Sequence, residues 1–306
     1  MKKISLESSE LARILSAPGG TDPVMIILDD ELTSRSGEKF PVMEDIFCLL
    51  SREERGKDLG DKKFYEENPF GVRDWSDPAD VEQGVEKEFK AFIRDIDPAI
   101  LIGDIGAGSG RISNYLSFKG YKKVISLDYS FNSLRMINRV SSNLCIWGNN
   151  LALPFQTGSL DVVISTGVIH HTPDPPKALG ECARVLKPGG RMYLRMRNLN
   201  SLYGYLFYTY CSFLRFCDRR RSLRPLSDLF GFRVYKLTRS LFYPHLPKRP
   251  DNELRGKYEN LFIKGLITFY RTSEVKKMLD EFGLKILHGK KVSFTHRQHF
   301  YILTKD

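Results

Sequence analysis

A glycine-rich turn between a strand pattern and a helix pattern is the clearest chemical feature of this sequence. The run Gly106-Ala107-Gly108-Ser109-Gly110 follows an apolar stretch that includes Asp104 and precedes a helical pattern that begins at Arg111. Glycine lets the backbone turn tightly and approach a ligand without a clash at Cβ. In an open α/β sheet, ligands bind outside the carboxyl ends of the strands, where such turns lie. The turn therefore predicts a cofactor site.

Two residues beside this turn help to choose the cofactor. The dinucleotide fingerprint G-x-G-x-x-G requires glycine at the position of Arg111. Asp104 places a carboxylate where it would repel a pyrophosphate, whereas the ammonium group of an amino-acid cofactor would tolerate it. An NAD-linked oxidoreductase is therefore the weaker alternative, and an adenosyl amino acid is the favoured ligand.

Asp128 is the second candidate binding residue. It ends the apolar run that starts at Val124 and lies 18 residues beyond Gly110. A carboxylate at this strand tip can accept hydrogen bonds from both ribose hydroxyls, and a charged hydrogen bond is worth roughly 1.5–3 kcal/mol. The alternative is that Asp128 only caps the next helix, as Ser130 also could. Its spacing from the glycine turn favours ribose binding.

Strand and helix patterns alternate from residue 100 onward. The predicted strands are 100–104, 124–128, 144–147, 160–165, 191–196, 284–292 and 298–304, and the predicted helices are 111–118, 133–140, 176–186 and one that starts at Thr272. This alternation predicts a parallel, doubly wound sheet. The last two strands follow each other closely and predict an antiparallel edge hairpin. Upstream, we expect one amphipathic helix from Asp77-Pro78 to about Asp95, and a short strand over Val24–Leu28.

Residues 100–197 resemble the class I S-adenosylmethionine-dependent methyltransferases, especially the branch that includes the ubiquinone and menaquinone biosynthesis enzymes. The matching runs are Asp104–Gly110, Leu127–Ser130, Gly148–Phe155, Gly158–Val163, Val168–His171 and Arg184–Gly190. They follow the family's order and spacing and cover about a third of the chain. The resemblance implies a seven-stranded, mostly parallel, Rossmann-like sheet with an antiparallel C-terminal strand, and S-adenosyl-L-methionine (SAM) as the cofactor.

The resemblance also implies roles for individual residues. Gly106, Gly108 and Gly110 would line the amino-acid end of SAM, with Asp104 near its ammonium group, while Asp128 would hold the ribose and Tyr129 would pack on the adenine. Asn149 stands where the family usually has Asp beside the adenine amino group, and an amide oxygen can still accept from an amine. Leu151 would flank the ring, and Thr166 and Gly167 would lie near the sulfonium. Ala107 and Asn150 belong to the same cofactor-binding runs.

Two adjacent histidines follow the fourth strand of this pattern. His171, or less favourably His170, could act as a general base, because the pKa of histidine lies near neutral pH. The alternative is that they only pack against or orient the acceptor. Methyl transfer depends mainly on alignment of donor and acceptor, which can contribute about 7–11 kcal/mol, so a base is not essential. No N-P-P-Y or D-P-P-Y run follows the strand, which disfavours amino-methylation of bases or glutamine.

We predict three regions: an N-terminal extension over residues 1–75, a methyltransferase domain over 76–198 and 271–306, and an insertion over 199–270. Residues 37–50 faintly resemble a zinc-ribbon-derived module without its cysteines, so no metal is expected. Within the insertion, Leu199 to Arg249 holds 12 aromatic residues and 10 Lys and Arg. We interpret the insertion as a helical lid that covers the acceptor, with Tyr203, Phe207, Tyr210 and His245 as candidate contacts. The alternative is an extra helical layer or a dimer contact.

Charge is distributed unevenly along the chain. The formal net charge is +10, yet residues 191–306 hold 24 Lys and Arg against 9 Asp and Glu. This asymmetry indicates an anionic partner, such as an acidic substrate, an anionic membrane surface near Arg219-Arg220-Arg221, or nucleic acid. The alternative is a solvated basic face. We expect a cytoplasmic monomer or dimer, peripheral to a membrane if it binds one, because no signal peptide, transmembrane run or cysteine framework is visible.

The sequence thus predicts a methyltransferase that acts by direct SN2 transfer on a small, hydrophobic or lipid-like acceptor. An RNA methyltransferase is the alternative that the basic C-terminal third favours, although nucleic acid is the less expected partner. A further alternative is a methyltransferase-like module that binds the cofactor without turnover.

Overall fold

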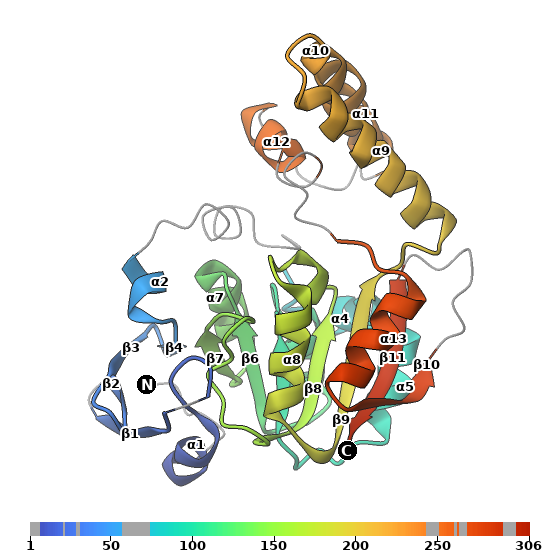
Figure 1. The fold of residues 1–306 in the computed structure, drawn as a ribbon. Coiled ribbons are helices and arrows are strands. Elements are labelled where there is room, and N and C mark those ends of the chain that lie inside the picture. Colours follow the sequence, from blue (N-terminus) through green and yellow to red (C-terminus); the bar gives the residue numbers. More distant parts are fainter. Residues whose placement is uncertain are drawn as a thin grey trace.

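A computed structural model shows a single large sheet covered by helices on both faces, with a helical arm that projects from one side (Figure 1). It describes residues 7–20, 22–28, 31–56, 74–242, 251–259, 262, 268–289 and 298–306. The strands are β1 (Val24–Leu28), β2 (Glu31–Ser34), β3 (Lys39–Met43), β4 (Ile46–Cys48), β5 (Ile102–Ile105), β6 (Val124–Asp128), β7 (Leu144–Trp147), β8 (Leu160–Thr166), β9 (Leu186–Arg197), β10 (Leu284–Gly289) and β11 (Gln298–Lys305).

The helices are α1 (Ser8–Ile14), α2 (Arg52–Gly56), α4 (Pro78–Gly84), α5 (Lys87–Arg94), α6 (Arg111–Phe118), α7 (Phe131–Val140), α8 (Pro175–Val185), α9 (Leu202–Asp218), α10 (Arg224–Ser227), α11 (Arg233–Phe242), α12 (Asp251–Tyr258) and α13 (Thr272–Glu281). A 3₁₀ turn, η1, covers Ile169–His171, and a π-helical turn, η2, joins α10 to α11 over Asp228–Phe232.

The strand order is β1-β2-β3-β4-β7-β6-β5-β8-β9-β11-β10. The run from β4 to β9 is parallel, and β11 pairs antiparallel with both β9 and β10. The prediction of a doubly wound, mostly parallel sheet with an antiparallel C-terminal hairpin is confirmed. The predicted count of seven strands is wrong, because the sheet continues beyond β7.

The additional strands come from the N-terminal segment. β4 pairs in parallel with β7, matching Ile46 with Cys145 and Cys48 with Trp147, and β3, β2 and β1 follow in antiparallel order. The strand predicted over Val24–Leu28 is β1, but nothing in the sequence indicated that the N-terminal strands would pair with the edge of the main sheet.

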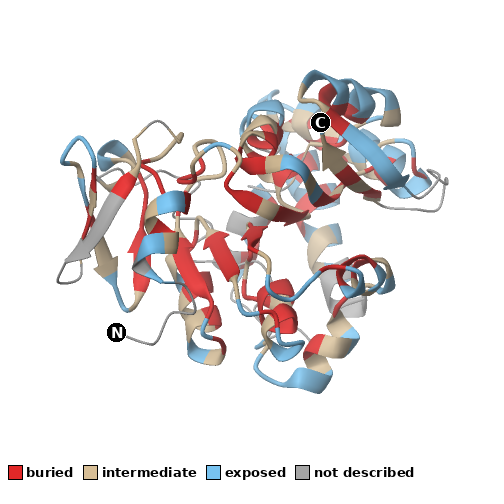
Figure 2. Cartoon of the chain, turned by 90° about the horizontal axis from the view of Figure 1, so that it is seen from below, coloured by how far each residue is buried: buried red, intermediate tan, exposed pale blue. Residues whose placement is uncertain are grey.

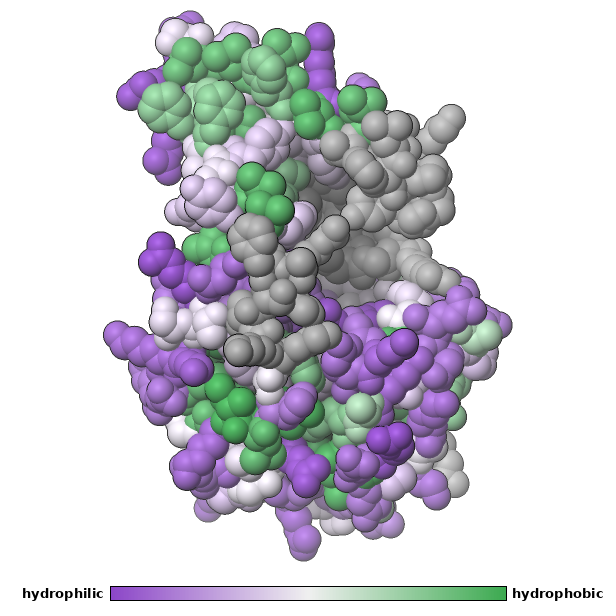
Figure 3. Space-filling view, turned by 90° about the vertical axis from the view of Figure 1, so that its right-hand side faces the viewer, coloured by the Kyte–Doolittle hydropathy of each residue, from purple (hydrophilic) through white to green (hydrophobic). Residues whose placement is uncertain are grey.

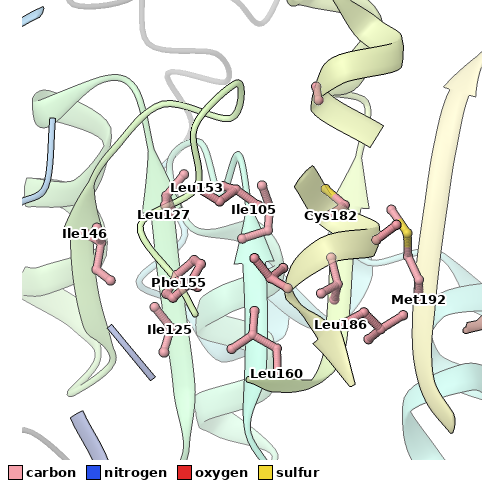
Figure 4. Packing of buried hydrophobic residues seen from close by; sticks show 14 of the residues in the cluster. Ile105, Ile125, Leu127, Ile146, Leu153, Phe155, Leu160, Cys182, Leu186 and Met192 are labelled. Atoms are coloured by element: carbon pink, nitrogen blue, oxygen red, sulfur yellow. The ribbon is translucent and has the colours of Figure 1, made fainter. Parts of the chain in front are cut away.

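Apolar side chains on the two sheet faces form separate core layers. On one face, side chains from α1, α8 and α13 pack on the alternating residues of the strands, among them Leu127, Leu160 and Met192 (Figure 4). On the other, α4, α5 and α6 pack on residues such as Val124, Val162 and Tyr193. Figure 2 shows the resulting pattern, with buried strands inside and exposed outer helices. The parallel strands are buried on both faces, as expected for this architecture.

The predicted single helix over residues 77–95 is interrupted. α4 ends at Gly84, Val85 is extended (φ −93°, ψ 135°), and α5 starts at Lys87. A Cβ at Gly84 would lie 2.4 Å from the ring of Trp75, so any larger residue here would displace that ring. At the break, the carboxylate of Glu86 pairs with Arg111 and Arg195, and these ion pairs stabilise the interrupted form.

The arm consists of α9, α10, η2, α11 and α12 and lies beyond the carboxyl end of β9 (Figure 1). It has a small core of its own, formed by Leu214, Phe232, Leu254 and Tyr258. No helix in the described part of the chain is long and apolar enough to cross a membrane.

Candidate cofactor site

A cavity of about 670 Å³ opens at the carboxyl ends of the parallel strands. β6 and β7 lie on one side of β5, and β8 lies on the other, so the strand order reverses between β5 and β8. A cavity at this point is where a doubly wound sheet binds its ligand. The predicted residues that line it are Asp104, Gly106, Ala107, Gly108, Asp128, Tyr129, Asn149, Asn150, Leu151, Thr166, Gly167 and His171.

The glycine turn fits closely under the loop after β8. Gly106 has φ +79°, and a Cβ there would lie 2.3 Å from Cγ1 of Val168. Gly110 has φ +98° and caps α6, but it does not line the cavity. Gly106 therefore shapes the cavity floor, whereas Gly110 directs the chain into the helix.

Asp128 connects two loops of the site. Its Oδ2 accepts a hydrogen bond of 2.7 Å from the backbone N–H of Gly108, and its Oδ1 accepts one of 2.8 Å from that of Ser130. A carboxylate oxygen has two lone pairs and can accept more than one hydrogen bond, so this side chain is suited to a ligand hydroxyl. Ser130 caps the next helix, α7: its hydroxyl oxygen accepts a hydrogen bond from the backbone N–H of Ser133.

Asp104 is buried at the base of the cavity. Its Oδ2 accepts a hydrogen bond of 2.7 Å from Ser113 Oγ, which in turn accepts one of 2.8 Å from Ser126 Oγ. Burial raises the pKa of Asp104 to about 6, although the Ser113 hydrogen bond and Arg111 favour the charged form. A cationic ligand group beside this carboxyl would restore its ionised form.

Several residues that line this cavity were not predicted to do so. Among them are Trp75, Arg111 and Ile112, and Glu54 on α2. Glu54 Oε1 accepts a hydrogen bond from Asn149 Nδ2, while Asn149 Oδ1 accepts one of 2.9 Å from the N–H of Leu151. The Ser51-x-x-Glu54 spacing is a capping-box signal, which predicts α2 but not its contact with Asn149.

Arg111 belongs to an ion-pair cluster at the cavity wall. Its guanidinium donates to Glu86 Oε2 at 2.6 Å, and Glu86 also pairs with Arg195. Burial alone would raise the pKa of Glu86, but the two guanidinium groups have the larger combined effect, so the pKa is lower than its ordinary value. Arg111, the residue that breaks the dinucleotide fingerprint, therefore holds the turn between α4 and α5 at the wall of the cavity.

The two histidines of η1 differ in position. His171 lines the cavity, whereas His170 is buried behind it and does not. Both ring nitrogens of His170 lack a hydrogen-bond partner in the described structure, and burial lowers the pKa of His170 well below 6.5. The structure thus brings one of the two base candidates to the cavity.

The aromatic residues that we assigned to a lid lie in the arm and do not line this cavity. Tyr203 stacks on Phe207, and Phe207 packs against Phe262 and Phe269. The hydroxyl of Tyr210 donates a hydrogen bond to the carbonyl oxygen of Phe230. His245 lies outside the described residues. No group of three or more His, Cys, Asp or Glu side chains in the described ranges is arranged to hold a metal.

A doubly wound sheet with a cavity at its switch point has the arrangement in which such sheets bind their ligands. Residues 103–194 match the family model described as a methyltransferase domain. The central part of the chain is therefore a SAM-dependent methyltransferase domain, and the predicted cofactor is confirmed.

Three relatives illustrate the range of similar proteins. An uncharacterized chloroplastic methyltransferase of Arabidopsis thaliana is 34% identical over 121 residues, which cover 35% of this chain and 34% of the relative. A probable tRNA methyltransferase 9B of Mus musculus is 30% identical over 118 residues (38% and 26%). A demethylmenaquinone methyltransferase of Lactococcus lactis is 43% identical over 76 residues (23% and 30%). The matches thus span about a third or less of these relatives.

The magnesium protoporphyrin IX methyltransferase of Synechocystis with bound SAH is a similar solved structure. It has a TM-score of 0.46 and 14% identity, and the alignment covers 83% of this chain and 98% of that one. The names of the Mus musculus and Lactococcus lactis relatives give different acceptors.

Proposed function

We propose that this protein is a SAM-dependent methyltransferase that transfers the methyl group by direct SN2 displacement to a small, hydrophobic or lipid-like acceptor. One observation carries the proposal: the glycine turn, Asp128 and the end of β8 converge on one cavity at the switch point of the sheet. Two atoms at this cavity, Ser133 Oγ and Asn150 Oδ1, are buried and have no protein partner in the described structure. Buried polar atoms are normally hydrogen-bonded, so this site fits a polar ligand.

Different residues of the cavity would contact different parts of the cofactor. Asp128 would accept hydrogen bonds from the ribose, and the carboxyl of Asp104 would face the ammonium group. Tyr129 and Leu151 would enclose the adenine, with Asn149 and Asn150 beside its polar edge. Thr166 and Gly167 would lie near the reacting end, since Thr166 ends β8, Gly167 follows it, and β8 pairs with the strand that leads into the glycine turn.

When bound, SAM supplies a methyl group that is already activated by a sulfonium. The protein then needs to exclude water and to align the acceptor, which can contribute about 7–11 kcal/mol. His171 is the cavity histidine that could take a proton from an acceptor hydroxyl or hold it by a hydrogen bond. His170 would support this residue through the contact of their rings, whose centroids are 4.4 Å apart.

Two features favour a small hydrophobic acceptor. Besides its polar residues, the cavity wall includes the apolar side chains of Ile112, Val168 and Pro173. The Lactococcus relative is named for a quinone-type acceptor. A basic C-terminal third and a relative named as a probable tRNA methyltransferase favour RNA as the second candidate.

Calorimetric titration with SAM, its demethylated product and NADH tests the cofactor. We expect micromolar binding of both adenosyl ligands, and in Asp128→Ala a loss of roughly tenfold or more, the equivalent of a charged hydrogen bond. Asp95→Ala removes an exposed carboxylate outside the site and should bind like the wild type. Preference for NADH, or no binding of either adenosyl ligand, would reject the proposal.

The acceptor class requires a separate experiment. Methyl transfer from labelled SAM to hydrophobic extracts and to total tRNA, each measured across a salt series, would distinguish the two candidates. RNA binding should weaken steeply as salt rises, because bound phosphates release counterions. Cofactor binding without transfer to either pool would favour a module without turnover.

A further inference from the structure

The arm exposes an apolar row on the opposite side from its own small core. Along α10, η2 and α11, exposed apolar residues lie on one side of the helix, with Leu229 and Phe230 adjacent and the others three or four positions apart: Leu226 (37% exposed), Leu229 (43%), Phe230 (48%), Val234 (39%) and Leu237 (59%). The buried side of the same segment is formed by Ser227, Gly231 and Phe232, which face Tyr258 and α9. The segment therefore presents one apolar side inward and a second one to the surface.

α9 repeats this arrangement. Leu202, Leu206, Phe213 and Phe216 are between 46% and 55% exposed, while Cys211, Leu214 and Cys217 are buried. Figure 3 shows hydrophobic side chains gathered over the arm, in contrast to the mostly hydrophilic surface of the sheet domain. Apolar residues scattered singly on a surface are ordinary, but two exposed rows on adjacent helices are not.

Arginine side chains surround a hollow beside the first row. The hollow, of about 640 Å³, is lined by Arg221, Arg224, Arg233 and Arg255, together with Leu229 and Phe232. We call it the arginine hollow. Among the described lining residues Asp228 is the one acidic side chain, and it pairs with Arg255 at 2.8 Å. From residue 202 to residue 242 the chain carries eight Lys and Arg against two Asp, so the exposed rows lie in a strongly positive field.

From this combination we propose that the arm docks on an anionic phospholipid surface, with lipid headgroups in the arginine hollow and the neighbouring apolar row of α10, η2 and α11 against the acyl chains. Amphipathic helices with Leu and Phe on one side and arginine beside them lie in the plane of such an interface. The docking is independent of which acceptor the enzyme methylates. It requires no spanning helix, and the described part of the chain has none.

Charge and side-chain type favour a membrane over other partners. A second copy of the chain would bring the same arginine clusters together, and like charges at an interface are costly. RNA would suit the arginines and the aromatic rings but would gain little from exposed Leu226, Leu229 and Leu237, because bases bind by stacking on planar groups. An anionic lipid surface satisfies both the arginines and the aliphatic row.

Flotation of the full-length protein with vesicles tests the proposal. One set of vesicles contains phosphatidylcholine alone, and a second contains phosphatidylcholine mixed with phosphatidylserine. The wild type should float with the anionic vesicles and remain behind with the neutral ones. Each basic residue near an anionic surface contributes about fivefold to partitioning, so the double variant Arg221→Glu and Arg233→Glu should lose at least about twentyfold.

Matched controls separate the arm from general charge and general hydrophobicity. Lys276→Glu with Lys277→Glu reverses two exposed charges on α13 and should float nearly as well as the wild type. Phe230→Ser with Leu237→Ser shortens the apolar row and should reduce flotation, whereas Phe118→Ser, at an exposed ring on α6, should not. Calorimetric SAM binding by each variant confirms that the sheet domain is folded and active in binding.

Three results would overturn the proposal. The first is equal flotation with neutral and anionic vesicles or with neither. The second is equal loss in the arm variants and their α13 and α6 controls. The third is binding of tRNA that the arginine variants abolish while vesicle binding is absent, which would assign the arm to nucleic acid. None of these outcomes bears on SAM binding, so the methyltransferase proposal would stand or fall separately.

Discussion

Asn149 donates a hydrogen bond through its Nδ2 atom to Oε1 of Glu54, although the two residues are 95 positions apart in the chain. The side-chain oxygen of Asn149, Oδ1, accepts a hydrogen bond from the N–H of Leu151. Glu54 and Leu151 therefore hold the two ends of the Asn149 side-chain amide. The other carboxylate oxygen of Glu54 accepts from the N–H and hydroxyl of Ser51. The N-terminal segment thus positions a side chain of the cofactor cavity.

Replacement of Glu54 should therefore weaken cofactor binding. In Glu54→Ala we expect the affinity for SAM to fall by roughly tenfold, the equivalent of one charge-assisted hydrogen bond. Loss of the Ser51 cap should also reduce stability by about 1 kcal/mol. Calorimetry and thermal unfolding measure the two effects. Glu53→Ala, an exposed neighbour on α2, serves as the control, and an unchanged affinity in Glu54→Ala would show that Glu54 does not shape the cavity.

The raised pKa of Asp104 predicts a pH dependence of SAM binding. Above about pH 6 the carboxyl is ionised and can pair with the ammonium group, while below it the carboxyl is neutral, so affinity should fall as the pH drops from 7 to 5. Binding near pH 6 should release a proton, which calorimetry detects in buffers of different ionisation enthalpy. In Asp104→Asn both effects should disappear, and their persistence would assign them to another group.

Asp104 also predicts an effect on the free protein. Its folded-state pKa lies above the ordinary value of 3.8, so the folded state binds the proton more tightly than the unfolded chain does. The free energy of unfolding contributed by this group is then largest below about pH 4 and decreases as the pH rises through 6. Denaturant unfolding of Asp104→Asn should show a weaker decrease over this interval than the wild type.

Gly106→Ala should close the cofactor cavity. A Cβ at this position would lie 2.3 Å from Val168, and the positive φ adds a strain of about 1–2 kcal/mol for any other residue. Gly120→Ala is a matched control, since it has φ +86° but no atom within 4 Å of the new Cβ. Both variants should lose stability through backbone strain, while only Gly106→Ala should lose SAM binding by tenfold or more. Equal affinities would mean that the loop after β8 moves aside freely.

The buried histidines predict acid sensitivity. Burial lowers the pKa of His170 well below 6.5 and also lowers that of His299, so the unfolded chain binds protons that the folded state excludes. The free energy of unfolding should therefore decrease as the pH falls through about 6.5, the ordinary pKa of histidine. Urea unfolding at pH 7.5 and pH 5.5 measures this, and His170→Asn should reduce the difference. An unchanged difference would assign the acid sensitivity to His299 or to another group.

The sequence predicted the main sheet because its strands carry a strong local signal. The predicted bounds Val124–Asp128, Leu144–Trp147 and Arg111–Phe118 coincide with β6, β7 and α6. Each of these segments is apolar or amphipathic and is bounded by a turn or cap residue, so its conformation is determined within about ten positions. The cavity residues that follow these strands were predictable for the same reason, since chain order places them at the same edge.

Contacts between distant segments were not predictable. The pairing of β4 with β7, the approach of Glu54 to Asn149 and the break at Glu86 all depend on partners between 25 and 109 residues away. The periodic apolar pattern of residues 81–93 indicated one helix, and the two guanidinium groups that hold Glu86 could not be inferred from it. The aromatic residues of the arm predicted a helix but not its position relative to the cavity.

The place of β11 in the sheet has a consequence for synthesis on the ribosome. β9 ends at Arg197, yet its outer neighbour β11 begins only at Gln298, and β10 pairs with β11 alone. While about one hundred residues are translated, the emerging chain would present β9 as an unpaired edge, a template for contacts with other nascent chains. The outer edge of β9 is therefore covered only after β11 has been translated, and chaperones should bind the nascent chain most during that interval.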